Sequence, residues 1–166
     1  MKVVADKLKE LSITELDKNT QDMYIRSAFN RYYYASHFIV RGEVGSLVPA
    51  DDFPHSSQMG KPLKGSYKNK IRDKLKDFGA AIAHEKEKNL DDLIKTIIKN
   101  AVKLYDARQL ADYKDNAKIV FFADAATISD SQGVFTFTFD DAQRCLNDIS
   151  DCIEQINIIK QEVGLI

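Results

Sequence analysis

The chain has 166 residues, of which 44% are hydrophobic and 30% are charged, a balance typical of a soluble globular domain and not of a disordered polar tract. This length predicts a single domain, residues 1–166, that buries a core without help from a metal or a disulfide. No apolar run approaches the roughly 20 residues of a membrane span, and the opening stretch MKVVADKLKELS lacks the apolar centre of a signal peptide. We therefore expect a cytoplasmic protein with no membrane partner.

Helical periodicity dominates the first part of the chain. A short amphipathic segment at about residues 2–11 precedes a long one at about 17–46. In the long segment, apolar residues recur at steps of three and four, which indicates a buried helical stripe. Residues 48–66 contain all three prolines and predict a loop. The stripe consists of Ile25, Ala28, Phe29, Tyr32, Ala35, Ser36 and Ile39.

A basic segment follows the loop. Residues 61–76 carry seven basic side chains and one acid, Asp73, in a chain whose net charge is −1. Within it, residues 67–78 predict a helix, and two interpretations are open: a solvated helix face, or a surface for an anionic partner such as nucleic acid. In the second interpretation the nucleic-acid-binding residues are Lys68, Lys70, Arg72 and Lys74.

The second half predicts two more helices with β-structure between them. Apolar residues at helical spacing mark helices at about residues 90–113 and 140–163, the latter with Asp140 as its cap and Gln143 at capping-box spacing. The strictly alternating VFTFTF, residues 134–139, predicts a strand. Its expected partner lies in KIVFFADAATI, which gives a β-hairpin at about residues 118–139. The fold class we expect is therefore all-α: an up-and-down bundle of four to five helices with an inserted β-hairpin.

The two cysteines, Cys145 and Cys152, are seven residues apart in the last predicted helix. The helical rise separates their Cα atoms by about 10 Å, which exceeds the roughly 7 Å that a disulfide tolerates. We expect both to be core thiols, and neither has the spacing of a metal ligand.

The stretch NRYYYASHF, residues 30–38, raises the question of chemistry. On a helix Asn30, Tyr34, His37 and Arg41 share one face, whereas Arg31 and His37 lie about 120° apart around the axis. Two interpretations are open. In the first, two of the tyrosines are core residues and His37 is a hydrogen-bonded helix histidine. In the second, these residues form part of a site.

A second polar cluster, YDARQLADY, ends the helix before the predicted hairpin. Arg108 continues the buried stripe of that helix, and a buried guanidinium is costly unless it is paired. Asp112 lies four residues on, but acid after base is the less favourable order on a helix. We therefore expect Arg108 and Asp112 to pair with each other and with a side chain of the tyrosine helix.

The two clusters together resemble the HEPN superfamily (higher eukaryote and prokaryote nucleotide-binding domains). The matching residues are Arg31, Tyr33, Tyr34 and Ala35, then Arg108, Ala111, Asp112 and Tyr113, and His55 falls near where relatives often carry a histidine. The resemblance implies a helical bundle that forms a homodimer. It also implies either a metal-independent ribonuclease of a toxin–antitoxin or phage-defence system or a non-catalytic partner of a nucleotidyltransferase. It implies no cofactor and no metal.

The sequence departs from the ribonuclease motif after Arg108. Relatives that cut RNA place a histidine four to six positions after the arginine, whereas this chain places Asp112 and Tyr113 there. A carboxylate lacks the ability of imidazole to supply both proton transfers of RNA cleavage. The first hypothesis is therefore a non-catalytic accessory domain that associates with RNA or a nucleotide. The alternatives are a ribonuclease and a regulatory helical interaction module. For the ribonuclease, the candidate catalytic residues are Arg31, His37, Arg108 and Asp112. His55 is a second candidate histidine, and Arg41 is a further candidate to stabilise charge.

Overall fold

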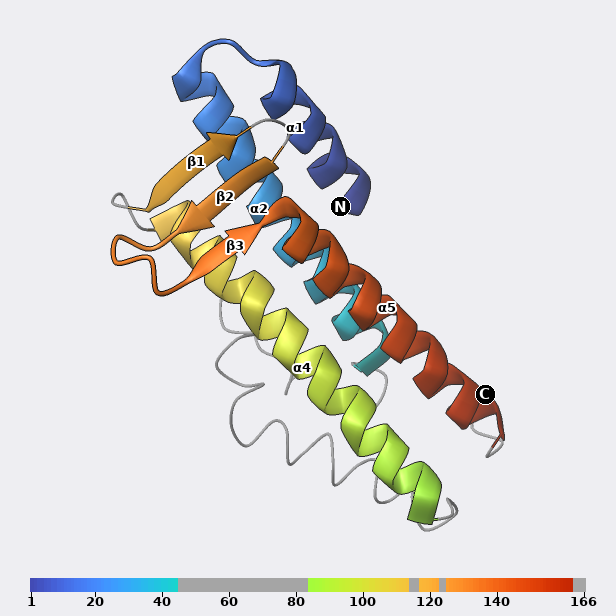
Figure 1. The fold of residues 1–166 in the computed structure, drawn as a ribbon. Helices are drawn as coiled ribbons and strands as arrows, with labels where there is room; N and C mark the ends of the chain where they lie inside the picture. Colours follow the sequence, from blue (N-terminus) through green and yellow to red (C-terminus); the bar gives the residue numbers. More distant parts are fainter. Residues whose placement is uncertain (45–83, 114–116, 123–124, 163–166) are drawn as a thin grey trace. The chain divides into compact units, whose positions relative to one another are not determined.

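The computed structural model describes residues 1–44, 84–113, 117–122 and 125–162 (Figure 1). Within them the structure has four helices and three strands. These elements are α1 (Lys2–Thr14), α2 (Lys18–Val44), α4 (His84–Tyr113), β1 (Lys118–Phe122), β2 (Ala125–Ser129), β3 (Thr136–Thr138) and α5 (Phe139–Glu162). The expected helix at residues 67–78, with Lys68, Lys70, Arg72 and Lys74, lies outside the described residues, as does His55.

The chain divides into two compact units. One comprises Met1–Ser36 and Lys103–Leu146, and the other comprises His37–Val102 and Asn147–Ile166. Helices α2, α4 and α5 each contribute residues to both units. We call them the sheet unit and the helical unit and describe each by itself.

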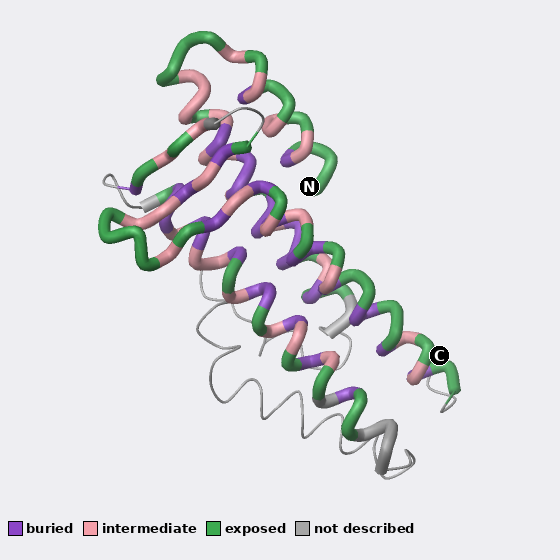
Figure 2. The backbone as a smooth tube through the Cα atoms, viewed as in Figure 1, coloured by how far each residue is buried: buried purple, intermediate pink, exposed green. Residues whose placement is uncertain are grey.

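The core of the sheet unit is aromatic. The rings of Phe29 and Phe139 stack with their centroids 4.8 Å apart, and Phe137 lies 6.2 Å from Phe29. Tyr32 and Tyr33 are both fully buried, as are Ile25, Ala28 and Phe29, so the stripe predicted along α2 is confirmed in this unit. Figure 2 shows the same helical recurrence of buried positions along α4.

A three-stranded antiparallel sheet in the order β1-β2-β3 stands where the sequence predicted a two-stranded hairpin. The strand count was therefore wrong. The stretch KIVFFADAATI forms two strands that pair with each other, Lys118 opposite Ser129 and Phe122 opposite Ala125. Ile128 then pairs with Phe137 of β3. The turn before β3 is held by Asp130, whose carboxylate accepts hydrogen bonds from the backbone N–H groups of Val134 and Phe135.

The strand predicted at residues 134–139 is shortened at both ends, because Val134 and Phe135 bond to Asp130 in the turn and α5 begins at Phe139. Thr138 and Asp141 form a reciprocal capping box: the Asp141 N–H donates to Thr138 Oγ1 at 3.0 Å, and the Thr138 N–H donates to Asp141 Oδ2 at 3.1 Å. Helix α5 therefore begins at Phe139. The prediction of Asp140 as the cap was wrong, because Thr138, two residues earlier, accepts the hydrogen bond from the Asp141 N–H.

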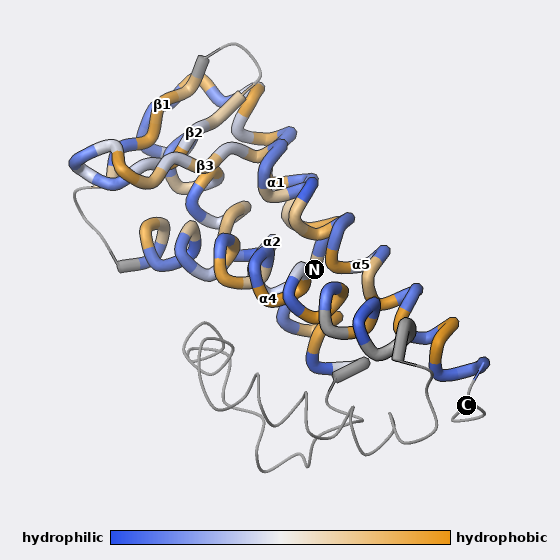
Figure 3. Tube along the Cα trace, turned by 60° about the horizontal axis from the view of Figure 1, so that its bottom comes forward, coloured by the Kyte–Doolittle hydropathy of each residue, from blue (hydrophilic) through white to orange (hydrophobic). Residues whose placement is uncertain are grey.

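The helical unit has an aliphatic core with one buried polar contact. Ile94, Ile97, Ile149 and Ile153 are buried, and Figure 3 shows hydrophobic positions alternating with hydrophilic ones along α5. Asn100, 5% exposed, donates from Nδ2 to Asp148 Oδ2 at 3.0 Å. Cys152 of this unit and Cys145 of the sheet unit are both buried and not in a disulfide, as predicted.

Candidate functional site

The side chains of the two sequence clusters meet in the sheet unit. Helix α2 contributes Asn30, Tyr33 and Tyr34, and α4 contributes Arg108 and Asp112. We call these five residues the arginine–tyrosine site. Arg108 is only 4% exposed, so its permanent charge has to be stabilised by neighbouring groups instead of water.

The charge of Arg108 is paired within its own helix. Arg108 Nε donates to Asp112 Oδ2 at 2.9 Å, which confirms the predicted pair. Asn30 of α2 supplies the additional partner that the unfavourable base-to-acid order required, because its Nδ2 donates to both oxygens of Asp112, at 2.7 and 2.8 Å. The carboxylate thus links α4 to α2.

The guanidinium lies over two neighbouring tyrosine rings. The Cζ atom of Arg108 lies 5.1 Å from the ring centroid of Tyr33 and 5.4 Å from that of Tyr34, within the range in which an aromatic face attracts a cation. Tyr105 packs edge-on against Tyr33 with a centroid distance of 5.8 Å. Burial raises the pKa of Tyr33 to about 12, although the nearby Arg108 acts in the opposite direction. Tyr33 is therefore a neutral phenol at physiological pH.

This geometry favours a structural role for the arginine over a catalytic one. A residue that stabilises a developing phosphorane charge must turn its N–H groups toward substrate, whereas Arg108 is buried against tyrosine rings and bonded to Asp112. Asp112, whose side chain is 22% exposed, already accepts hydrogen bonds from Arg108 and Asn30. Among the side chains that the structure describes, no three His, Cys, Asp or Glu residues gather where they could hold a metal ion.

The other candidate residues have different environments. Arg31 and Arg41 are exposed on α2, whereas His37 is 2% exposed and its ring packs against Phe38 with a centroid distance of 5.7 Å. Arg31 belongs to the sheet unit and His37 to the helical unit. The side chain of Tyr113 lies outside the described part of the chain. A catalytic role for Arg31 or His37 stays a prediction.

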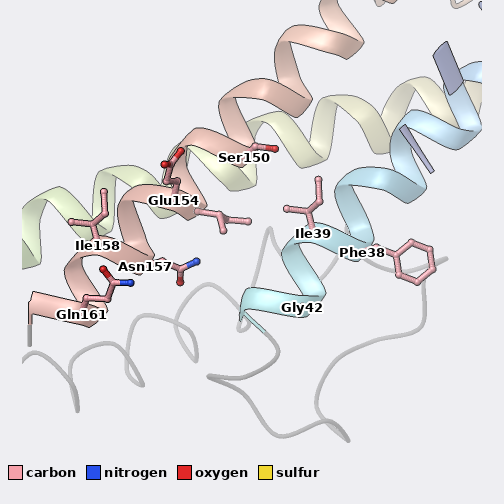
Figure 4. A pocket seen from close by; sticks show the side chains of 9 residues that line it. Phe38, Ile39, Gly42, Ser150, Glu154, Asn157, Ile158 and Gln161 are labelled. Atoms are coloured by element: carbon pink, nitrogen blue, oxygen red, sulfur yellow. The ribbon is translucent and has the colours of Figure 1, made fainter. Parts of the chain in front are cut away.

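Sequence reasoning missed a groove in the helical unit (Figure 4). It has a volume of about 590 Å³ and lies between α2, which contributes Phe38 and Gly42, and α5, which contributes Glu154, Asn157 and Ile158. Phe38 and Ile158 are about half exposed. No single motif marks it, because its walls come from two helices that are far apart in the sequence.

Comparison of the chain with protein-family models, with curated proteins and with solved structures gave no match. Separately, none of the helices in the described ranges is both long and apolar enough to cross a lipid bilayer.

Proposed function

We propose that this protein is a HEPN-like accessory domain that associates with RNA or a nucleotide and carries out no reaction itself. It acts as a homodimer beside a catalytic partner such as a nucleotidyltransferase, in a toxin–antitoxin or phage-defence system. The observation that carries the proposal is that the guanidinium of Arg108 is buried and bound by neighbouring side chains. The residue on which the resemblance to ribonucleases depends is buried, lies against the rings of Tyr33 and Tyr34, and is hydrogen-bonded to Asp112.

Asp112, which lies four residues after Arg108, also supports an accessory role. Asp112 occupies the stretch where cleaving relatives have histidine, and its oxygens accept hydrogen bonds from Asn30 and Arg108. His37 is 2% exposed, whereas a general acid or base has to come within hydrogen-bond reach of the substrate. In this proposal the arginine–tyrosine site stabilises the fold, and binding of RNA falls to the basic segment at residues 61–76.

Charge reversal in the basic segment tests the binding half of the proposal. The variant Lys68→Glu, Lys70→Glu, Lys74→Glu should bind a labelled single-stranded RNA more weakly, and its logarithmic salt slope should shrink by about 2, because each lost phosphate contact removes about 0.7. The control is Lys88→Glu, Lys99→Glu, Lys103→Glu, which makes the same change in net charge at exposed positions of α4. Equal loss of binding in both variants, measured by fluorescence anisotropy, would show a general charge effect and contradict the proposal.

A cleavage assay tests the other half. The purified chain in EDTA should leave single-stranded RNA intact, and His37→Ala and His55→Ala should leave RNA binding largely unchanged. Cleavage that is lost on His37→Ala or His55→Ala would establish the ribonuclease alternative. Absence of both binding and cleavage would favour a regulatory interaction module.

A further inference from the structure

The outer strand of the sheet unit has one unpaired edge. Among the described residues β1 pairs with β2 alone, in an uninterrupted register from Lys118 to Phe122. Natural proteins commonly protect such edges with proline, a β-bulge or several charges. The sequence KIVFF has no proline, its register has no bulge, and its one charge, Lys118, lies at its first position. Within the described ranges, the backbone N–H and C=O groups along this edge are therefore available to another strand.

Both faces of β1 leave apolar surface beside this edge. Val120 is 57% exposed on the face turned away from the helices. On the opposite face, Ile119 and Phe121 border a cavity of about 410 Å³, together with Ile25 and polar residues of α2. A strand added beyond β1 would alternate its side chains between these two faces, so every second one would reach toward that cavity.

We propose that β1 of a second copy of this chain occupies the edge, with the two strands antiparallel around a two-fold axis between the two Val120 residues. This register pairs Ile119 of each copy with Phe121 of the other and overlaps all five residues of both strands. It also separates the two Lys118 side chains to opposite ends of the pair, whereas a parallel pairing would place them side by side. This contact rests on the homodimer of the proposed function and specifies the surface through which that homodimer forms. The argument for the edge itself does not depend on RNA.

A charge at the axis should break this dimer. Val120→Lys places two lysines directly opposite each other, where like charges are destabilising. Since Val120 is exposed, the fold should survive, as judged by circular dichroism. The control is Thr136→Lys, which adds the same charge at an exposed position on β3, the other edge strand. Sedimentation equilibrium from low to high micromolar protein should show a dimer for the wild type and Thr136→Lys and a monomer for Val120→Lys.

A cross-link tests the same contact without a destabilising charge. Directly opposed residues of antiparallel strands have Cα atoms about 4.5–5.5 Å apart, within the range of a disulfide. Val120→Cys should therefore form a covalent dimer on mild oxidation, whereas Thr136→Cys should not. The native Cys145 and Cys152 are buried and serve as an internal control, since the wild type should stay uncross-linked.

Three outcomes would overturn the proposal: a wild-type monomer at high micromolar protein, a Val120→Lys dimer as stable as the wild type, or equal loss of the dimer in both lysine variants. These results are distinguishable from a failure of the proposed function. RNA binding that responds to the basic segment in a monomeric protein would refute only the strand contact. A dimer that responds to Val120→Lys but binds no RNA would refute only the function.

Discussion

The two members of the Arg108–Asp112 pair are not equivalent. The Arg108 side chain is 5% exposed and that of Asp112 is 22% exposed. Loss of the carboxylate removes an ion-pair partner from a guanidinium that is buried. Loss of the guanidinium leaves a carboxylate near solvent that still accepts hydrogen bonds from Asn30. The carboxylate is therefore the more damaging member to remove.

We expect Asp112→Ala to lower the free energy of unfolding by about 3 kcal/mol, because it removes the ion-pair partner of a buried guanidinium. Chemical denaturation measures the change. The matched control is Asp92→Ala, which removes the acid of an exposed pair with Lys95 and should cost less than about 1 kcal/mol. Equal and small effects would mean that the burial of Arg108 does not depend on Asp112.

Asp6 joins α1 to the rest of the sheet unit. Its carboxylate accepts hydrogen bonds from Tyr32 Oη and Lys2 Nζ, both at 2.7 Å, and from Gln143 Nε2 at 3.2 Å. Burial raises the pKa of Asp6, but the hydrogen bonds from Lys2, Tyr32 and Gln143 outweigh it and hold the pKa below the ordinary value of 3.8. The burial of Tyr32 and the neighbouring Asp6 carboxylate raise the pKa of that phenol, which keeps it a hydrogen-bond donor.

The lowered pKa of Asp6 predicts a contribution to acid sensitivity. Because the folded-state pKa lies below the unfolded value, the ionised carboxylate stabilises the fold above that unfolded value. The stabilisation is lost as the pH falls through the folded pKa. Between about pH 5 and pH 3, Asp6→Asn should therefore lose less free energy of unfolding than the wild type. Asp151→Asn removes an exposed acid of α5 and should follow the wild-type curve; if it instead matched Asp6→Asn, net charge would explain the effect.

At the scale of elements, the junction between β3 and α5 decides where strand ends and helix begins. Thr138 is the last residue of β3 and the cap of α5, and the carboxylate of Asp141 accepts both the N–H and the hydroxyl of Thr138. Asp140 is exposed, and its Oδ1 lies 3.6 Å from Lys9 Nζ. One capping box thus fixes the boundary between two kinds of structure.

Substitution at the two residues separates their roles. Thr138→Ala should lower the free energy of unfolding by about 1 kcal/mol, because it leaves the Asp141 N–H without its acceptor. Asp140→Ala should cost only about 0.3–1 kcal/mol, through a weaker interaction with the helix dipole. Urea denaturation of both variants measures the difference. A larger loss for Asp140→Ala than for Thr138→Ala would restore Asp140 as the cap.

At the scale of the whole molecule, three continuous helices contribute to both compact units. The two cysteines report on the units separately, because Cys145 belongs to the sheet unit and Cys152 to the helical unit. Both are buried, so a thiol reagent reaches each one only when its unit opens.

We expect the two units to unfold together, because opening either one interrupts the hydrogen bonds of shared helices. In single-cysteine variants, Cys145→Ala and Cys152→Ala, the remaining thiol should become reactive at the same denaturant midpoint. Midpoints are the correct measure, since burial and the nearby Asp148 and Asp151 raise the pKa of Cys152 and slow its reaction. Circular dichroism provides the control for overall unfolding. Clearly separated midpoints would show that each unit is an independent folding unit.

The sequence alone determined the four described helices, the part of the α2 stripe that lies in the sheet unit, the two buried thiols and the Arg108–Asp112 pair, because each depends on residues within a few turns of one helix. The up-and-down bundle, the homodimer and the roles of Arg31, His37 and Lys68 stay predictions. The tertiary structure decided the rest. Asn30 completes the site from 82 residues away, and a third strand replaces the hairpin because β2 pairs with strands on both sides. Such contacts depend on which distant segments pack together and on which side chain accepts the hydrogen bond of a free N–H group. The periodicity of apolar residues along the chain predicts neither.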